Sequence, residues 1–206
     1  MTWEVFNMIG TLAFAASGAI VAMEEDYDLL GFYILGFAAA FGGGAVRNLL
    51  IGIPVSELWA QNELFIAAIV FITLIFLFPR VILPHWRKWE SFFDAIGLSA
   101  FAIQGAVYAS GMNHHISAVI VAAVLTGSGG GIIRDILAGR KPVVLRDDVY
   151  AAWAVLGGLI IGIGLASRPF ELYFLLAALV VLRMLSVHYR WKLPSMPTQQ
   201  NDQHLQ

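Results

Sequence analysis

Two motifs combine a run of three glycines with an arginine one helical turn later. Gly42, Gly43 and Gly44 precede Arg47, and Gly129, Gly130 and Gly131 precede Arg134. Three consecutive glycines cost a helix about 1 kcal/mol each relative to alanine and leave its backbone unshielded. In a lipid-facing segment, such backbone is tolerated only where protein buries it or water lines it. The motifs therefore predict a water-lined pathway or close packing through small residues. We favour the pathway, because packing rarely needs three glycines in a row.

The two arginines lie in apolar segments, where charged side chains tend to face cavities and to be functional. Snorkelling to the interface is the ordinary alternative. We favour a role in gating, lipid headgroup binding or anion neutralisation, because the two positions are matched in the sequence. Asp135, beside Arg134, takes the place that Asn48 holds beside Arg47.

Four further polar residues form matched pairs near the expected pathway. Asp94 opens the fourth apolar segment and Asn7 lies at the same place in the first. Both are predicted to cap their helices. The functional alternative is that they place a polar group at the mouth of the pathway. Ser17 and Gln104 each precede a glycine, and we expect them to form hydrogen bonds between helices.

An internal repeat relates all these residues at a single offset of 87 residues. Windows 7–19 and 94–106 are identical at 7 of 13 positions, and windows 41–52 and 128–139 at 6 of 12. The repeat contains three apolar segments, and this odd number means that the second copy inserts upside down. Inverted repeats of this kind are typical of transport proteins, with the pathway between the two copies.

The composition requires a membrane environment. Apolar residues make up 59% of the 206 residues and charged residues only 13%, whereas soluble domains carry about 25% charged residues. Seven segments have lengths near the roughly 20 residues that cross a bilayer: Val5–Met23, Leu29–Val46, Leu58–Pro79, Ala95–Met112, Ile116–Ile133, Val149–Ser167 and Pro169–Tyr189. The fold class is thus all-α: a polytopic membrane protein with seven transmembrane helices.

The predicted organisation is one membrane domain over residues 1–192. Repeat one covers residues 4–80, repeat two residues 91–167, and a seventh helix residues 169–190, followed by a disordered polar tail over 193–206. Eight lysines and arginines fall in the loops of one face and only Arg168 on the other. Positive charge marks the cytoplasmic side, so the N-terminus is expected outside and the C-terminus inside.

Other functional classes find little support in the sequence. No nucleophile with a neighbouring base and no carboxylate pair is apparent, so we do not expect an enzyme. No metal site or cofactor is expected, and no basic domain points to nucleic acid. Arg183, in the last segment, is expected to snorkel or to meet a neighbouring subunit.

The doubled motif resembles bacterial members of the trimeric intracellular cation (TRIC) channel family. The likeness rests on Gly42-Gly43-Gly44-x-x-Arg47 and Gly129-Gly130-Gly131-x-x-Arg134-Asp135 on a seven-helix plan, and extends to about residue 192. It implies a homotrimer with one K⁺ and Na⁺ pore per subunit, between the two repeats, with the second and fifth helices bent at their glycines. The Lys-Glu-Val signature of the animal channels is absent from this sequence, so phosphoinositide binding is not carried over.

Two transport functions follow as hypotheses. The first is a passive monovalent cation channel in a bacterial plasma membrane, with membrane lipids and further copies of the chain as its partners. The alternative is a small-solute transporter, for example for glycine, in which the matched arginines accept a carboxylate. A membrane scaffold is a third hypothesis, but it does not explain the duplicated arginines.

Overall fold

The computed structural model describes residues 2–145 and 149–193, so the predicted tail beyond residue 193 lies outside the described residues. Seven helices of at least 12 residues account for most of this part of the chain: α1 (Thr2–Glu24), α2 (Leu29–Ile51), α3 (Asn62–Leu77), α5 (Trp86–Gly111), α6 (Ile116–Leu137), α7 (Ala151–Gly162) and α8 (Pro169–His188). Shorter turns connect them: η1 (Val55–Leu58), α4 (Pro79–Ile82), η2 (Leu83–His85) and η3 (Val143–Leu145).

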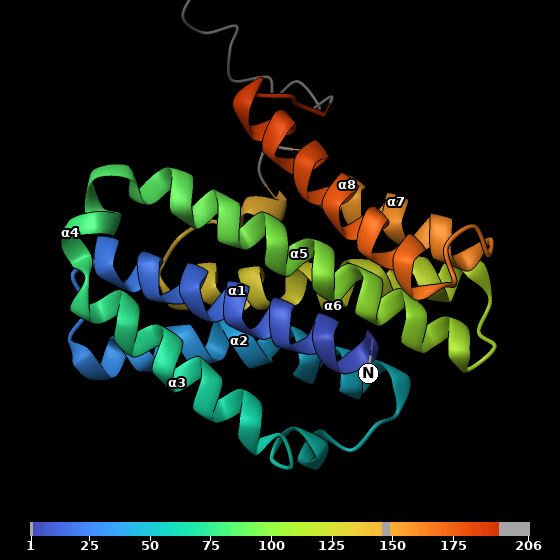
Figure 1. Ribbon diagram of the computed structural model, residues 1–206, viewed down its shortest axis with the longest axis horizontal. Coiled ribbons are helices and arrows are strands. Elements are labelled where there is room, and N and C mark those ends of the chain that lie inside the picture. The colour runs from blue at the N-terminus through green and yellow to red at the C-terminus, as the bar shows by residue number, and fades with distance from the viewer. Residues whose placement is uncertain (1, 146–148, 194–206) are drawn as a thin grey trace, which may run out of the picture.

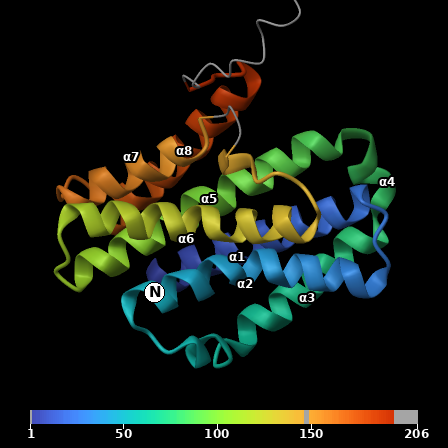
Figure 2. The same cartoon turned by 180° about the vertical axis from the view of Figure 1, so that it is seen from behind.

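Helices α1 and α5 form the centre of the molecule and run in opposite directions (Figure 1). Helices α2 and α6 pack together on one side of this pair, and α3 and α7 flank the two repeats (Figure 2). In α1 and in α5, 72% of the residues in the apolar span are buried inside the protein, whereas in α8 only 28% are. The predicted all-α fold, with two inverted three-helix repeats and one further helix, is confirmed.

The third helix of each repeat is shorter than expected. By length and composition, α1, α2, α5, α6 and α8 are long and apolar enough to cross a membrane, whereas α3 has 16 residues and α7 has 12. At 1.5 Å per residue, α7 is only about 18 Å long. It stops short of the predicted end at Ser167 because the chain turns at Gly164, whose φ of 79° a helix cannot adopt.

The ends of the second and fifth long helices are also matched. Helix α2 stops at Gly52, with φ of 74°, and α6 is followed by Gly139, with φ of 70°. These positions are 87 residues apart. Glycine adopts this left-handed conformation without the steric cost that a side chain adds, and it commonly ends helices. The repeat thus fixes where both glycine-bearing helices stop.

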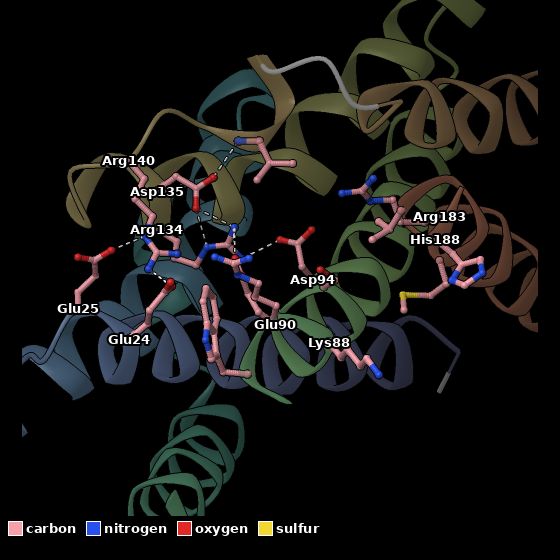
Figure 3. A pocket seen from close by; sticks show the side chains of 16 residues that line it. Glu24, Glu25, Lys88, Glu90, Asp94, Arg134, Asp135, Arg140, Arg183 and His188 are labelled. Carbon is pink, nitrogen blue, oxygen red and sulfur yellow. Dashed lines mark hydrogen bonds and ion pairs between the residues drawn. The ribbon is translucent and has the colours of Figure 1, made fainter. Parts of the chain in front are cut away.

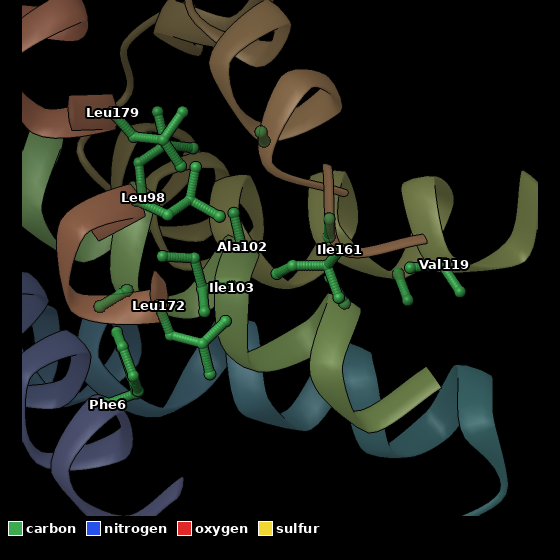
Figure 4. Close-up of a cluster of buried hydrophobic side chains, with 14 of the residues drawn as sticks. Phe6, Leu98, Ala102, Ile103, Val119, Ile161, Leu172 and Leu179 are labelled. Carbon is green, nitrogen blue, oxygen red and sulfur yellow. The ribbon is translucent and has the colours of Figure 1, made fainter. Parts of the chain in front are cut away.

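Helix α8 lies outside the two repeats and packs mainly on α5. A cluster of buried side chains joins α1, α5, α6, α7 and α8 (Figure 4). Leu172 and Leu179 of α8 lie in this cluster with Leu98 and Ile103 of α5 and Ile161 of α7. In a membrane these side chains stabilise the cluster mainly by van der Waals packing, because lipid tails are as apolar as the side chains. This packing holds the C-terminal half of α8, which is predicted to face the cytoplasm, beside the polar site described next.

Candidate functional site

The two glycine triplets lie where α2 crosses α6. A Cβ atom added to Gly43 would lie 2.6 Å from the carbonyl oxygen of Thr126, and one added to Gly130 would overlap the carbonyl oxygen of Ala39. Ala39 and Thr126 are themselves 87 residues apart, so the two contacts are equivalent. The backbones therefore touch at a pseudo-symmetric crossing that only glycine allows.

Both helices continue through their triplets. Residues 42–44 lie within α2 and residues 129–131 within α6, without a change in helical hydrogen bonding. The glycines therefore do not break either helix, because the facing helix shields the exposed backbone. The expected bend at the triplets stays a prediction, since a helix can bend while it remains continuous.

Two phenylalanines close the space beside the crossing. The rings of Phe14 and Phe101 lie 5.5 Å apart, and neither is more than 1% exposed. Each ring covers a glycine of the opposite central helix, with Phe101 on Gly10 and Phe14 on Gly97. These four positions also obey the repeat. The two rings thus fill the middle of the interface between the repeats.

Arg134 lies fully buried on one side of this closed centre. Its Nη1 donates to Asp94 Oδ1 on α5 at 2.8 Å and to Ser17 Oγ on α1. Its Nε and Nη2 donate to Asp135 Oδ1 at 2.9 and 2.7 Å, and Glu90 Oε1 lies 3.7 Å from Nη2. A buried cation is tolerated when it is paired and hydrogen-bonded. The carboxylates of α5 and α6 therefore neutralise Arg134, and the Ser17 hydroxyl links it to α1.

Arg47 repeats this local geometry on the other side of the crossing. Its Nε and Nη2 donate to Asn48 Oδ1 at 3.0 and 2.8 Å, as Arg134 does to Asp135. The guanidinium also lies 5.6 Å from the centre of the Tyr108 ring. Arg47 is only 4% exposed. Neither arginine snorkels, and each is held in place by the residue that follows it.

The helix-capping prediction is wrong for Asp94 and Asn7. Helix α5 begins at Trp86, about two turns before Asp94, and α1 begins at Thr2. The charged residues that precede Asp94 form the first turns of α5, where the sequence pattern suggested a loop. Asp94 is instead a buried partner of Arg134, and Asn7 Nδ2 donates to Gln61 Oε1 at 3.1 Å.

The matched pair Ser17 and Gln104 behaves unequally. Ser17 makes the expected bond between helices, because its hydroxyl accepts from Arg134. Gln104 is 1% exposed, and neither atom of its amide has a hydrogen-bond partner among the described residues. The same is true of the Thr126 hydroxyl on α6. The half of the interface that holds Gln104 therefore contains buried polar atoms with no protein partner.

A cavity of about 730 Å³ opens beside the Arg134 cluster (Figure 3). It lies between α1, α5, α6 and α8, and its lining includes Arg134, Asp94 and Glu90. Ten of its sixteen lining residues carry an acidic or basic side chain, apart from His188. The cavity thus opens from the protein surface to the Arg134 cluster, at one end of the interface between the repeats.

Arg140 closes one side of this cavity. It follows α6, and its guanidinium pairs with Glu24 and Glu25 at the end of α1 and lies 5.9 Å from the Trp86 ring. Partial burial lowers the pKa of Arg140, but the hydrogen bonds that its guanidinium donates to Glu25 and Glu24 outweigh this effect and leave the pKa raised. This link joins the ends of the two repeats at the cavity mouth.

Sequence reasoning missed three contributors to the site. Glu90 and Arg140 lie in charged stretches that were expected to be loops, and Tyr150 lies at the start of the apolar segment Val149–Ser167. Arg183, expected to snorkel or to meet another subunit, is instead buried against Tyr150 and lines the cavity. In the described residues, no group of three His, Asp or Glu side chains is arranged to hold a metal ion.

Comparison with known proteins places this geometry in a family. Residues 4–80 and 91–166 match a family model described as a glycine transporter. The membrane protein YvgT of Bacillus subtilis is 63% identical over 195 residues, which cover 95% of this chain and 96% of YvgT. The chain is therefore similar to a bacterial membrane protein over nearly its whole length.

Two solved structures share the fold. One, described as the structural basis for conductance through TRIC cation channels, is 35% identical, with a TM-score of 0.82, over 97% of this chain and 99% of that one. The TRIC trimeric intracellular cation channel orthologue from Rhodobacter sphaeroides is 29% identical, with a TM-score of 0.82, over 91% and 97%. The chain belongs to the bacterial TRIC channel family, which is the family that the matching model describes as a glycine transporter.

Proposed function

We propose that the chain is a passive channel for K⁺ and Na⁺, with one pore in each subunit between the two repeats. The path runs from the cavity past Arg134, through the crossing of α2 and α6, to Arg47. One observation carries the proposal: two matched polar clusters flank a single closed contact made by small residues and two aromatic rings. The solved bacterial relatives described as cation channels support the same function.

Neutralisation of Arg134 removes the main objection to cation passage. A bare arginine beside a pore repels cations, but Asp94 and Asp135 contact this guanidinium directly and Glu90 lies 3.7 Å away. The cluster therefore has no net positive charge when these carboxylates are ionised. We assign Arg134 a positioning role, in which it holds α1, α5 and α6 around the end of the path.

The described conformation is closed, so conduction requires α2 and α6 to separate at Gly43 and Gly130. The closest contacts of Gly43 and Gly130 are backbone carbonyls, with Phe101 and Phe14 next to them, so separation there disturbs few side chains. It also frees Phe14 and Phe101 to rotate away from the glycines that they cover. Bending of the two helices at their triplets is one way to achieve this separation.

A glycine carrier is the second candidate, and a specific observation favours it. The cavity is lined by carboxylates and by the buried Arg183. The carboxylates could pair with the amino group of an amino acid, and Arg183 with its carboxylate. The description of the matching family model points the same way. In such a carrier, opening of the crossing would alternate with closure of the cavity.

Reconstitution in liposomes separates the two candidates. A channel gives K⁺ flux that follows the ion gradient without saturation, together with single-channel current steps. A carrier gives saturable uptake of labelled glycine that is accelerated by glycine on the opposite side, and no current steps. Protein-free liposomes are the control. Absence of K⁺ flux combined with saturable glycine counterflow would overturn the channel proposal.

We further propose that the active form is a homotrimer in the bacterial plasma membrane, surrounded by lipid. Cross-linking in mild detergents should stop at three subunits, and a clean monomer or dimer in several detergents would contradict this. The proposed orientation, with the N-terminus outside, is equally testable. Because the chain has no cysteine, single cysteines at Asn113 (outside) and Arg190 (inside) can be labelled with an impermeant reagent on intact cells.

A further inference from the structure

Arg183 of α8 lines the cavity from which the proposed path starts, but the proposed channel gives it no role. It is 4% exposed, and its guanidinium stacks over the Tyr150 ring at 4.8 Å. Nη1 lies 3.5 Å from Ser186 Oγ, at the limit of a hydrogen bond, and this hydroxyl already donates to the Arg183 carbonyl at 2.7 Å. It also accepts from Trp153 Nε1 at 3.2 Å. Arg183 Nε has no hydrogen-bond partner in the described chain.

The carboxylates of the cavity are already engaged elsewhere. Asp94 and Asp135 bind Arg134, with Glu90 close by, and Glu24 and Glu25 bind Arg140. Within residues 2–145 and 149–193, no carboxylate lies within 4.0 Å of the Arg183 guanidinium. Buried cations are usually paired. Removing a neutral polar group from water without a hydrogen bond costs roughly 2–7 kcal/mol, and removing an unpaired charge costs more. Arg183 is therefore a buried cation that still needs an acceptor.

The wall around Arg183 is positively charged. Lys88 and His188 lie on the same side of the cavity as Arg183, across from Glu24, Glu25 and Arg140 (Figure 3). Lys88 and His188 also line the cavity and are exposed to it. The cavity is thus divided into a wall whose charges are neutralised and a wall that carries excess positive charge.

We propose that this wall is a binding site for an oxyanion, namely a phosphate or carboxylate group, held by Arg183 and assisted by Lys88. The planar guanidinium presents donors in a fork that matches two oxygens of such a group. The Tyr150 ring, whose centre lies 4.8 Å from the guanidinium carbon, packs against one side of the fork. A permeant cation would be repelled here, and a neutral solute would leave the positive charge uncompensated.

The site is compatible with two sources of the oxyanion. An adjoining apolar groove of about 400 Å³ shares Lys88 and Met184 with the cavity and is lined by Trp89 and Phe92. The acyl chain of an anionic lipid would fill this groove while its phosphate meets Arg183. A soluble phosphate or carboxylate would bind only at the positively charged wall, and the apolar groove would then contact ordinary membrane lipid.

Binding to the full-length protein in a neutral detergent tests the proposal. The first arm adds inorganic phosphate or acetate against chloride at constant ionic strength, and the second adds phosphatidylglycerol against phosphatidylcholine. Melting temperature and a direct titration give the affinity in each arm. Arg183→Gln removes the fork with little change in volume. Arg190→Gln, which removes an exposed arginine just beyond α8, is the matched control.

We expect saturable binding by the wild type and Arg190→Gln, weakened about ten-fold or more in Arg183→Gln. Binding in the first arm identifies a soluble oxyanion, and binding only in the second identifies a lipid headgroup; either result supports the site. Equal affinity in wild type and Arg183→Gln, or no saturable binding in either arm, overturns it. If Arg183→Gln does not fold, Lys88→Gln must show the same weakening for the proposal to stand. Because the readout is binding, its outcome is independent of the flux measured in liposomes.

Discussion

The carbonyl oxygen of Thr126 lies 2.6 Å from the point that a Cβ atom would occupy on Gly43. Helices α2 and α6 therefore meet backbone to backbone, and the equivalent contact joins Ala39 and Gly130. The closest approach of the two helices is therefore between main-chain atoms, with Phe101 and Phe14 packed beside it. It also leaves no room for even one additional methyl group.

The first prediction compares neighbouring glycines of one triplet. Gly43→Ala should destabilise the folded protein by roughly 1–3 kcal/mol, the usual cost of forcing an extra carbon into a packed contact. Gly44→Ala should be neutral or stabilise by up to about 1 kcal/mol, because alanine favours helix and the nearest neighbour is Leu58 Cδ2 at 3.5 Å, an ordinary contact. Thermal unfolding in detergent measures both. Equal melting temperatures for the two variants would mean that the crossing is looser than described.

The second prediction concerns the buried ion pair of Arg134 and Asp94. Arg134→Gln leaves several buried carboxylates without their cation and should cost about 3–5 kcal/mol. Asp94→Asn alone should cost less, because Asp135 still pairs with Arg134. Adding Asp94→Asn to Arg134→Gln should recover part of the loss. A double-mutant cycle from denaturant or thermal unfolding gives the coupling energy, and strict additivity would contradict direct coupling.

The third prediction concerns charge at the cavity mouth. Arg140→Glu replaces a cation by an anion beside Glu24 and Glu25, which attracts K⁺ to the mouth. We expect K⁺ conductance to rise about two- to ten-fold at low salt, in line with electrostatic focusing of ions. The gain should disappear near 1 M salt, where the screening length is only about 3 Å. Arg80→Glu, at an exposed arginine that does not line the cavity, should have no such effect.

The fourth prediction separates transport from folding at Gln104. Gln104→Leu removes a buried amide that has no partner among the described residues. Each such unsatisfied group costs about 1–3 kcal/mol, so the variant should be as stable as the wild type or more so. If the path passes Gln104, flux should nevertheless fall, and Gln104→Asn should retain more of it. A stable Gln104→Leu protein with normal flux would remove Gln104 from the path.

The repeat made much of the fold predictable. A constant offset of 87 residues predicted the inverted three-helix units and the equivalence of Arg47 and Arg134. The same offset describes contacts that no motif indicated, such as Phe14 on Gly97 and Phe101 on Gly10. The repeat in the sequence predicts these contacts because residues 87 positions apart have neighbours that are also 87 positions apart.

The remaining features depend on tertiary packing. Glu90 and Asp94 appeared to lie before or at a helix start, because an apolar run marks only the apolar part of α5 and misses its charged first turns. Arg183 lies near a helix end, where sequence alone suggests snorkelling; only the packing of Tyr150 against it reveals that it is buried. Whether glycines line water or backbone likewise depends on which helix lies opposite them.

The arginine pair is duplicated in geometry but not in charge, since Asp135 and Asp94 on one side correspond to Asn48 and Asn7 on the other. A conduction path built on this frame has unlike ends, one with carboxylates and one with carboxamides. Such a path rectifies: in identical solutions, its current differs in size when the voltage is reversed. Asp135→Asn makes the two ends alike at this position, and the current–voltage curve should then become more symmetric.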